Sequence, residues 1–186
     1  SITASHYALD SHAVRKREEG RVHLDGFLSY PSAVYTVPYG VMVPKEVGNL
    51  LLPVPVSGSH IGFSTLRMEP CWMAMGQAAG IASALSIDGK VKVQNIDLSR
   101  LQDKLVDQKA TLMYFKDVDY TSPHFRMVQY LGLRGYLPEW TARLQEPVDM
   151  ATQTAWKKLS GKDLPGIEAG KTTRLVALEM IYRKIK

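Results

Sequence analysis

The sequence predicts an α+β protein in which a β-rich first part with one glycine-containing helix precedes a small all-helical part. Three observations predict it. Residues 1–49 hold short segments rich in Tyr, Val and Pro, which are typical of short strands and loops. Residues 70–86 read as a long helix with small side chains. Beyond residue 97, apolar residues recur at helical spacing up to the C-terminus. We therefore place a domain boundary near residue 110, giving domains 1–110 and 111–186.

The first part begins with strand and loop material, of which Tyr30–Tyr39 is the clearest strand-like stretch. Residues 50–56 have the apolar content of a strand. However, Pro53 and Pro55 cannot donate ladder hydrogen bonds, so this stretch is an edge, a strand end or an extended run without pairing. Residues 57–67 read as a polar, glycine-containing loop.

The helix predicted over residues 70–86 starts with Pro70, whose missing N–H costs nothing in a first turn. Gly76 and Gly80 each cost about 1 kcal/mol relative to alanine in a helix. Since they lie on one face, we expect close packing of a neighbouring element to compensate. The sequence Asp88-Gly89 is a plausible stop.

Four further helices are predicted, each from a cap or an apolar stripe. The first has Asp97 as its N-cap. The others cover residues 122–132, 150–159 and 173–185. Their inward residues are predicted to be Leu98, Leu101, Leu105, Phe125, Val128, Leu131, Leu175, Leu178, Ile181 and Tyr182.

Composition excludes several classes of protein. With 186 residues, 45% hydrophobic and 22% charged, the chain is neither disordered, collagen-like nor a coiled-coil rod. Its longest apolar runs are far shorter than the ~20 residues that cross a bilayer, so no membrane span is predicted. A single cysteine, Cys71, excludes an internal disulfide and a cysteine-based zinc cluster.

The net charge of +5 resides in the last thirty residues, where eight basic residues face three acidic ones. A basic C-terminal helix is usually a solvated face that complements the helix dipole. Aromatic residues do not alternate regularly with these charges, so no nucleic-acid partner is predicted.

Residues 57–70, Ser-Gly-Ser-His-Ile-Gly-Phe-Ser-Thr-Leu-Arg-Met-Glu-Pro, form the one stretch with functional character. A helix N-terminus presents unpaired N–H groups that bind anionic groups. His60 and Arg67 would add donors there, and Glu69 could be a simple capping acid. A serine-rich turn with a structural histidine and a surface arginine fits the pattern too, and the pattern alone favours that plainer interpretation. The remaining histidines lack metal-ligand spacing, so no metal site is predicted.

Residues 47–86 resemble the C-terminal part of a family of FAD-dependent oxidoreductases. The shared pattern is an N-L-L segment, then S-x-S-H, then R-M-E-P, then a G-Q-A-A-G helix. Upstream, D-S-H at residues 10–12, V-P-Y at 37–39 and V-P-K-E-V at 43–47 match further elements. The resemblance covers roughly residues 5–90 with its motifs in order.

This resemblance implies that the helix after Glu69-Pro70 points its N-terminus at the flavin, where the helix dipole would stabilise the reduced, anionic ring. The implied catalytic residues are His60 and Arg67, which would orient an oxygen-bearing substrate while hydride passes to flavin N5. The implied cofactor-binding residues are Ser59, Arg67, Glu69, Pro70 and Gly76. Gly76 and Gly80 would pack the helix against the nucleotide-binding sheet.

The family's dinucleotide-binding fingerprint, Gly-x-Gly-x-x-Gly, is absent from this sequence. We therefore expect the chain to be the C-terminal part of a larger flavoprotein. Its expected partner is the N-terminal FAD-binding part of the same protein. The chain would bind FAD only together with that part and would not be active alone. Alone, it would expose apolar surface, through which a homodimer could form.

Residues 115–159 are similar to the S-layer homology repeat, with F-K-D-V at 115–118, a helix, R-G-Y-L at 134–137 and E-P-V at 146–148. In that family such modules bind cell-wall polysaccharide, which would indicate a cell-envelope or secreted location and a carbohydrate partner. Here D-M-A-T replaces the T-R-A-E step at 149–152, and Val176 replaces an acid after Thr173-Arg174. A compact helical appendage is the plainer interpretation.

A polysaccharide-directed protein therefore stays open as the alternative function. Some proteins of the oxidoreductase family carry the label xanthan lyase. A lyase needs a base and a cation beside the uronate, which Tyr39, His60 and Arg67 could nominally supply. A glycan-binding module in the helical part is the other form of this alternative.

Overall fold

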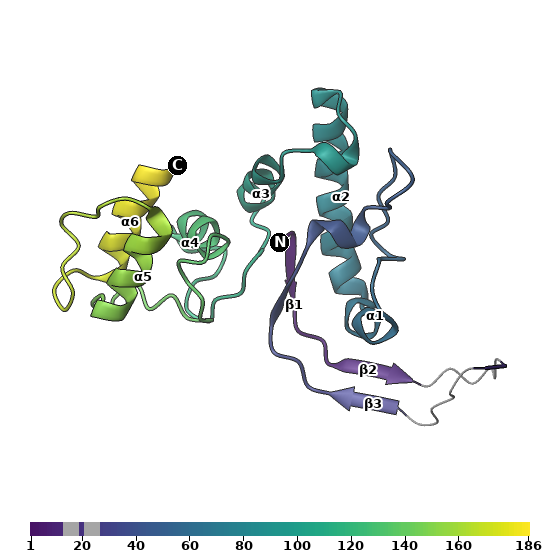
Figure 1. Ribbon diagram of the computed structural model, residues 1–186, viewed down its shortest axis with the longest axis horizontal. Helices are drawn as coiled ribbons and strands as arrows, with labels where there is room; N and C mark the ends of the chain where they lie inside the picture. Colours follow the sequence, from purple (N-terminus) through teal and green to yellow (C-terminus); the bar gives the residue numbers. More distant parts are fainter. Residues whose placement is uncertain (13–18, 21–26) are drawn as a thin grey trace. The chain divides into compact units, whose positions relative to one another are not determined.

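The structure is a computed structural model that describes residues 1–12, 19–20 and 27–186. The chain divides into two compact units, unit 1 (Ser1–Leu112) and unit 2 (Met113–Lys186). Strands are confined to unit 1 among the described residues, and unit 2 is helical (Figure 1). The predicted α+β class is confirmed.

Unit 1 contains two small antiparallel sheets. Strand β1 (Thr3–Ser5) pairs with β4 (Tyr35–Val37), and β2 (Leu9–His12) pairs with β3 (Phe27–Tyr30). Their registers place Thr3 opposite Val37 and Leu9 opposite Tyr30. In Figure 1 the β2–β3 pair lies at the end of the unit where α1 is found.

Residues 50–56 form no strand, as their two prolines allowed. Leu52 N–H donates to the Met42 carbonyl over 2.8 Å, and Ser57 N–H donates to the Val41 carbonyl over 2.7 Å. The stretch therefore lies beside the 3₁₀ helix η1 (Tyr39–Met42) and bends at residues 53–55.

Helix α1 (His60–Leu66) corrects the prediction of a loop over residues 57–67. Ser59 is its N-cap, and the Ser59 Oγ accepts the Gly62 N–H over 3.0 Å. The helix buries Ser64, Thr65 and Leu66. An N-cap contributes about 1 kcal/mol, so capping and burial together outweigh the cost of Gly62.

Helix α2 (Glu69–Gly89) is the longest element of unit 1 and ends at the predicted Asp88-Gly89 stop. It ends because Lys90, not Gly89, takes the left-handed conformation (φ 50°). Its inward face buries Cys71, Met75, Ala78, Ala82 and Leu85.

The opposite face of α2 carries exposed Met73 and Ile87. At Gly76 and Gly80, no atom lies within 4 Å of the place where a Cβ would be. The close packing that the sequence predicts for these glycines is therefore not made by the described part of this chain, which packs on the other side of the helix.

The rest of unit 1 is η2 (Val93–Asn95) and α3 (Leu98–Asp107). Asp97 caps α3 as predicted, with its Oδ1 accepting the Ser99 N–H over 2.8 Å. Leu101 and Leu105 are fully buried, but Leu98 is 47% exposed, contrary to expectation. As the first residue of the helix, Leu98 precedes the turn that packs on α2.

Unit 2 is built from α4 (Phe125–Gly132), α5 (Met150–Ser160) and α6 (Arg174–Ile185). The predicted start of α4 at Ser122-Pro123 is wrong, because these residues form a turn in which Phe125 N–H donates to the Ser122 carbonyl. The core of the unit is apolar and includes Phe115, Val128, Leu131, Tyr136, Val148, Trp156, Leu178 and Ile181.

Three polar side chains hold the loops of unit 2, of which Gln129 and Arg174 are buried and Asp117 is exposed. Gln129, fully buried, accepts the Met113 N–H and donates to the Met113 carbonyl, as a neighbouring strand would. Asp117 accepts the N–H groups of Ala142 and Arg143 over 2.8 and 2.7 Å. Arg174, only 4% exposed, donates its Nε–H to the Ala142 carbonyl over 2.8 Å.

No helix among the described residues is long and apolar enough to cross a membrane, as the sequence predicts.

Replacing Gly132 by alanine is expected to destabilise unit 2 by about 1–3 kcal/mol, the usual cost of overpacking. The added Cβ would lie 2.9 Å from Phe115 Cζ and 3.1 Å from Met113 Sδ, and Phe115 is buried. Urea unfolding followed by circular dichroism measures the change. The control is Gly76→Ala, which has open space and should gain stability through helix propensity. Equal shifts for both variants would contradict the clash.

Candidate functional site

Helix α1 lies along strand β2 and is joined to it at both ends. His60 Nε2 donates to the His12 carbonyl over 2.8 Å. The Ser64 Oγ accepts the Asp10 N–H over 3.2 Å, and the Thr65 hydroxyl donates to the Tyr7 carbonyl. These bonds align the helix antiparallel to the strand, with His60 at the His12 end.

Arg67 follows α1 and forms an ion pair with Asp10, which we call the Asp10–Arg67 pair. The distance from Arg67 Nη2 to Asp10 Oδ2 is 2.6 Å. Arg67 Nε–H also donates to the Ser64 carbonyl over 3.2 Å, and the guanidinium lies 5.8 Å from the centre of the Tyr7 ring. The side chains are 37% and 29% exposed, so the pair is fixed yet reachable from solvent.

Asp10 has a second neighbour on its own strand. Its Oδ1 lies 3.6 Å from His12 Nε2, and the His12 side chain is 71% exposed. The carboxylate therefore joins one permanent cation, Arg67, to a histidine that is charged only when protonated. Asp10 and His12 belong to the D-S-H motif of the sequence, which assigns them no role. The need of Arg67 for an acidic partner is the sequence signal that points to Asp10.

Three of the predicted site residues lie at the two ends of α1. Ser59 and His60 start α1, and Arg67 follows its last residue. At about 1.5 Å per residue, the two ends of this short helix are about 10 Å apart. The structure therefore brings Arg67 together with Asp10 rather than with His60.

Glu69 and Pro70 form the exposed first turn of α2, with Gly76 two turns further along the helix. The N-cap is Met68, whose side chain makes no capping bond. Glu69 likewise makes no capping bond to this helix end, although its negative charge suits a first turn. The Met68 side chain therefore leaves this helix end uncapped, although Pro70 has no N–H and the Cys71 N–H donates to the Met68 carbonyl over 3.0 Å.

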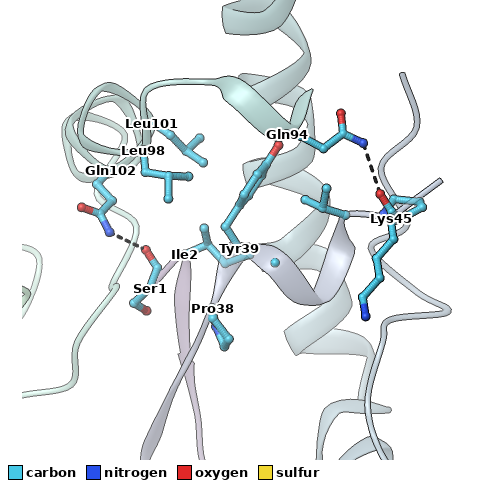
Figure 2. Close-up of a pocket in the computed structure, with 12 residues that line it drawn as sticks. Ser1, Ile2, Pro38, Tyr39, Lys45, Gln94, Leu98, Leu101 and Gln102 are labelled. Atoms are coloured by element: carbon cyan, nitrogen blue, oxygen red, sulfur yellow. Dashed lines mark hydrogen bonds between the residues drawn. The ribbon is translucent and has the colours of Figure 1, made fainter. Parts of the chain in front are cut away.

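Tyr39 lies elsewhere, in the wall of a cavity of about 520 Å³ formed by the two residues before β1, by η1 and the residues that follow it, and by η2 and α3 (Figure 2). The Tyr39 hydroxyl donates to the Val93 carbonyl over 2.9 Å. The wall is largely apolar and includes Ile2, Leu98 and Leu101 (Figure 2). Neither His60 nor Arg67 lines this cavity.

The nominal lyase set of Tyr39, His60 and Arg67 is therefore not assembled. Tyr39 is only 7% exposed, and burial raises the pKa of its phenol to about 12. A phenol that holds its proton so firmly and donates it to a carbonyl is a poor general base near neutral pH.

Tyr39 should make the stability of unit 1 fall at alkaline pH. Its folded pKa of about 12 exceeds the reference value of 10.0, so the stabilisation is complete below pH 10 and is lost as pH rises towards 12. Two pKa units correspond to about 2–3 kcal/mol. Urea unfolding below and above this window should show the fall for the native chain and not for Tyr39→Phe. Tyr120→Phe, at an exposed tyrosine, is the control. Identical alkaline losses in all three proteins would contradict the assignment.

No cluster of three or more His, Cys, Asp or Glu side chains that could hold a metal ion is found within residues 1–12, 19–20 and 27–186.

Comparison with known proteins gives one match. The model of the FAD dependent oxidoreductase family matches residues 1–105, which is more than half of the chain. No curated protein and no solved structure matches the chain. The matched residues include β2, α1, the Asp10–Arg67 pair and the whole of α2. The chain therefore belongs to the FAD dependent oxidoreductase family.

Proposed function

We propose that unit 1 supplies the flavin-facing and substrate-facing surface of an FAD-dependent oxidoreductase. In this proposal an N-terminal FAD-binding part of the same protein completes the site. The family match over residues 1–105 carries the proposal, because it covers α1 and α2 in a sequence that has no Gly-x-Gly-x-x-Gly fingerprint. FAD is the cofactor of the family, and its adenosine diphosphate half would bind to the other part.

The open surfaces of unit 1 fit this arrangement. At the N-terminus of α2, Glu69 and Pro70 are exposed and no side chain caps the helix, so its dipole is available to an electron-rich ring edge. Along the same helix, the space beside Gly76 and Gly80 is free for another element to approach the backbone. When bound, the flavin would supply an acceptor for hydride.

Arg67 and His60 are the residues we assign to the substrate. Arg67 is held by Asp10 and by the Ser64 carbonyl, so its remaining N–H groups can orient a substrate oxygen without moving. His60 gives its Nε2–H to the His12 carbonyl, which leaves Nδ1 as the ring atom that can take a proton. Ser59 fixes the start of this helix as its N-cap.

The proposal is tested by the absorbance spectrum of the full-length protein and of this chain, purified in the same way. Visible bands of bound flavin in the full-length protein alone are the expected result. If neither protein shows flavin, even after FAD is added, the oxidoreductase assignment fails and the polysaccharide-directed alternative gains weight. Flavin held by this chain alone would overturn the need for a second part.

For unit 2 we propose a compact helical appendage that carries an S-layer-homology-like pattern without its glycan-binding role. Arg174 is the basic residue that the pattern retains. Its guanidinium is buried, donates to the Ala142 carbonyl and lies 5.2 Å from the centre of the Trp156 ring. These contacts support a role inside the fold, since they use the groups that a glycan would need. Failure of unit 2 to bind isolated cell-wall polysaccharide in a pull-down is the expected result.

A further inference from the structure

The Asp10–Arg67 pair is fixed by one buried residue. Ser64 is 4% exposed, accepts the Asp10 N–H at its Oγ and accepts the Arg67 Nε–H at its carbonyl. The Asp10 backbone and the Arg67 side chain are thus anchored to the same turn of α1. The pair joins two residues that are 57 positions apart in the sequence.

The charge of this pair is close to zero. An isolated guanidinium is the preferred protein ligand for a carboxylate or phosphate, which it binds through two parallel hydrogen bonds. Here the Asp10 carboxylate already accepts one hydrogen bond from Arg67 Nη2 over 2.6 Å. A second carboxylate brought to Arg67 would stand beside the first, and two carboxylates that share a site repel each other.

The Arg67 guanidinium nevertheless keeps N–H donors that are not used by Asp10 or Ser64. Within the part of the chain that the structure describes, the guanidinium is engaged through Nε and Nη2. Nη1 makes no hydrogen bond to the described residues, and the Arg67 side chain is 37% exposed. A hydroxyl or carbonyl oxygen can accept from the Nη1 N–H groups without meeting a net charge.

We propose that the Asp10–Arg67 pair makes the substrate site select a neutral oxygen group, a hydroxyl or a carbonyl, and reject an acid. This inference rests on the proposed function, because it assumes that Arg67 faces the substrate. Asp10 is then a positioning residue that both holds Arg67 and cancels its attraction for anions. The substrate class is an alcohol or its carbonyl counterpart with no acidic group beside the reacting carbon.

The test is a calorimetric titration of the FAD-loaded full-length protein with acetate, with the flavin spectrum recorded in parallel. All proteins are titrated at one fixed pH, because His12 also lies beside the Asp10 carboxylate. Asp10→Asn removes the negative charge and keeps an oxygen for Arg67. Glu168→Gln, at an exposed ion pair with Lys171 in unit 2, is the matched control for the change in net charge.

We expect acetate to bind Asp10→Asn at least tenfold more tightly than it binds the native protein or Glu168→Gln. Adding Arg67→Gln to Asp10→Asn should abolish the gain. The inference is overturned if the native protein binds acetate as tightly as Asp10→Asn does, or if the double variant keeps the gain. Should Asp10→Asn fail to fold, Asp10→Ser removes the same charge and is read in the same way.

The flavin spectrum distinguishes a failure of this inference from a failure of the proposed function. Tighter acetate binding that also perturbs the flavin bands supports both. Tighter binding with an unchanged spectrum supports the neutralising role of Asp10 but overturns the place of Arg67 beside the flavin, and with it the selection of substrate. An unchanged affinity in a protein that holds flavin overturns the inference alone.

Discussion

Replacing Trp156 by alanine is expected to destabilise unit 2 by about 3–5 kcal/mol, the range for large aromatic side chains deleted from a core. Trp156 is 2% exposed, and its Nε1–H donates to the Tyr136 carbonyl over 2.7 Å. Arg174 packs over its ring, so the deletion would also leave a buried cation beside a cavity. Because whole domains are stable by only about 5–15 kcal/mol, this loss should leave unit 2 largely unfolded in mild urea.

Far-ultraviolet circular dichroism across a urea series measures this loss without depending on tryptophan emission. Trp156→Phe is the informative comparison, because it keeps most of the buried ring and removes only the hydrogen bond. That bond accounts for about 1–2 kcal/mol. If alanine and phenylalanine at this position had the same effect, the tryptophan would not be the packing centre described above.

Replacing Gly80 by leucine is expected to remove flavin from the full-length protein while leaving this chain folded. Gly80 is exposed, and no atom lies within 4 Å of its would-be Cβ. In the chain alone, the substitution should stabilise α2 by up to about 1 kcal/mol. In the complete flavoprotein, a leucine would stand where another element approaches the helix backbone, and overpacking of that kind costs about 1–3 kcal/mol or more.

Two readouts are needed for this variant: the thermal midpoint of the chain and the flavin content of the full-length protein. Ser99→Leu places the same side chain on an exposed position of α3 and should change neither. A Gly80→Leu flavoprotein with full flavin content would show that this face of α2 stays open in the complete protein. That result would remove the physical reason for the two glycines.

Elements with a cap and a regular apolar stripe could be predicted from the sequence. Helix α3 begins after Asp97 as predicted, and α6 begins after Thr173, whose side chain accepts the Val176 N–H. In these helices the local signal and the buried face agree, so the boundaries differ from the structure by at most a residue or two.

Helix α1 could not be predicted in this way. It spans seven residues, contains Gly62 and buries two polar residues, Ser64 and Thr65, beside a single apolar one, Leu66. What stabilises it is contact with β2, and β2 lies about fifty residues earlier in the chain. A period of apolar residues cannot report such contacts, so a helix of this kind looks like a polar loop.

For the candidate site too, the sequence predicts some features and only the structure shows the others. His60 and Arg67 stand out in the sequence because their motif is unusual, but motif spacing says nothing about their partners. The ion pair with Asp10 depends on how α1 is laid against β2, and the burial of Tyr39 depends on the fold of η1 against η2 and α3. Both facts change the chemistry assigned to these residues, and both come only from three-dimensional structure.

The single cysteine of this chain makes site-specific labelling possible. Cys71 is 6% exposed on the inward side of α2, and burial raises the pKa of its thiol, so the reactive thiolate is scarce and shielded at neutral pH. The native protein should therefore stay unlabelled by maleimide reagents while folded. A cysteine introduced in place of exposed Met73 could then carry the sole fluorophore on this chain. Its emission would report directly whether anything covers the outer face of α2 when the complete protein assembles.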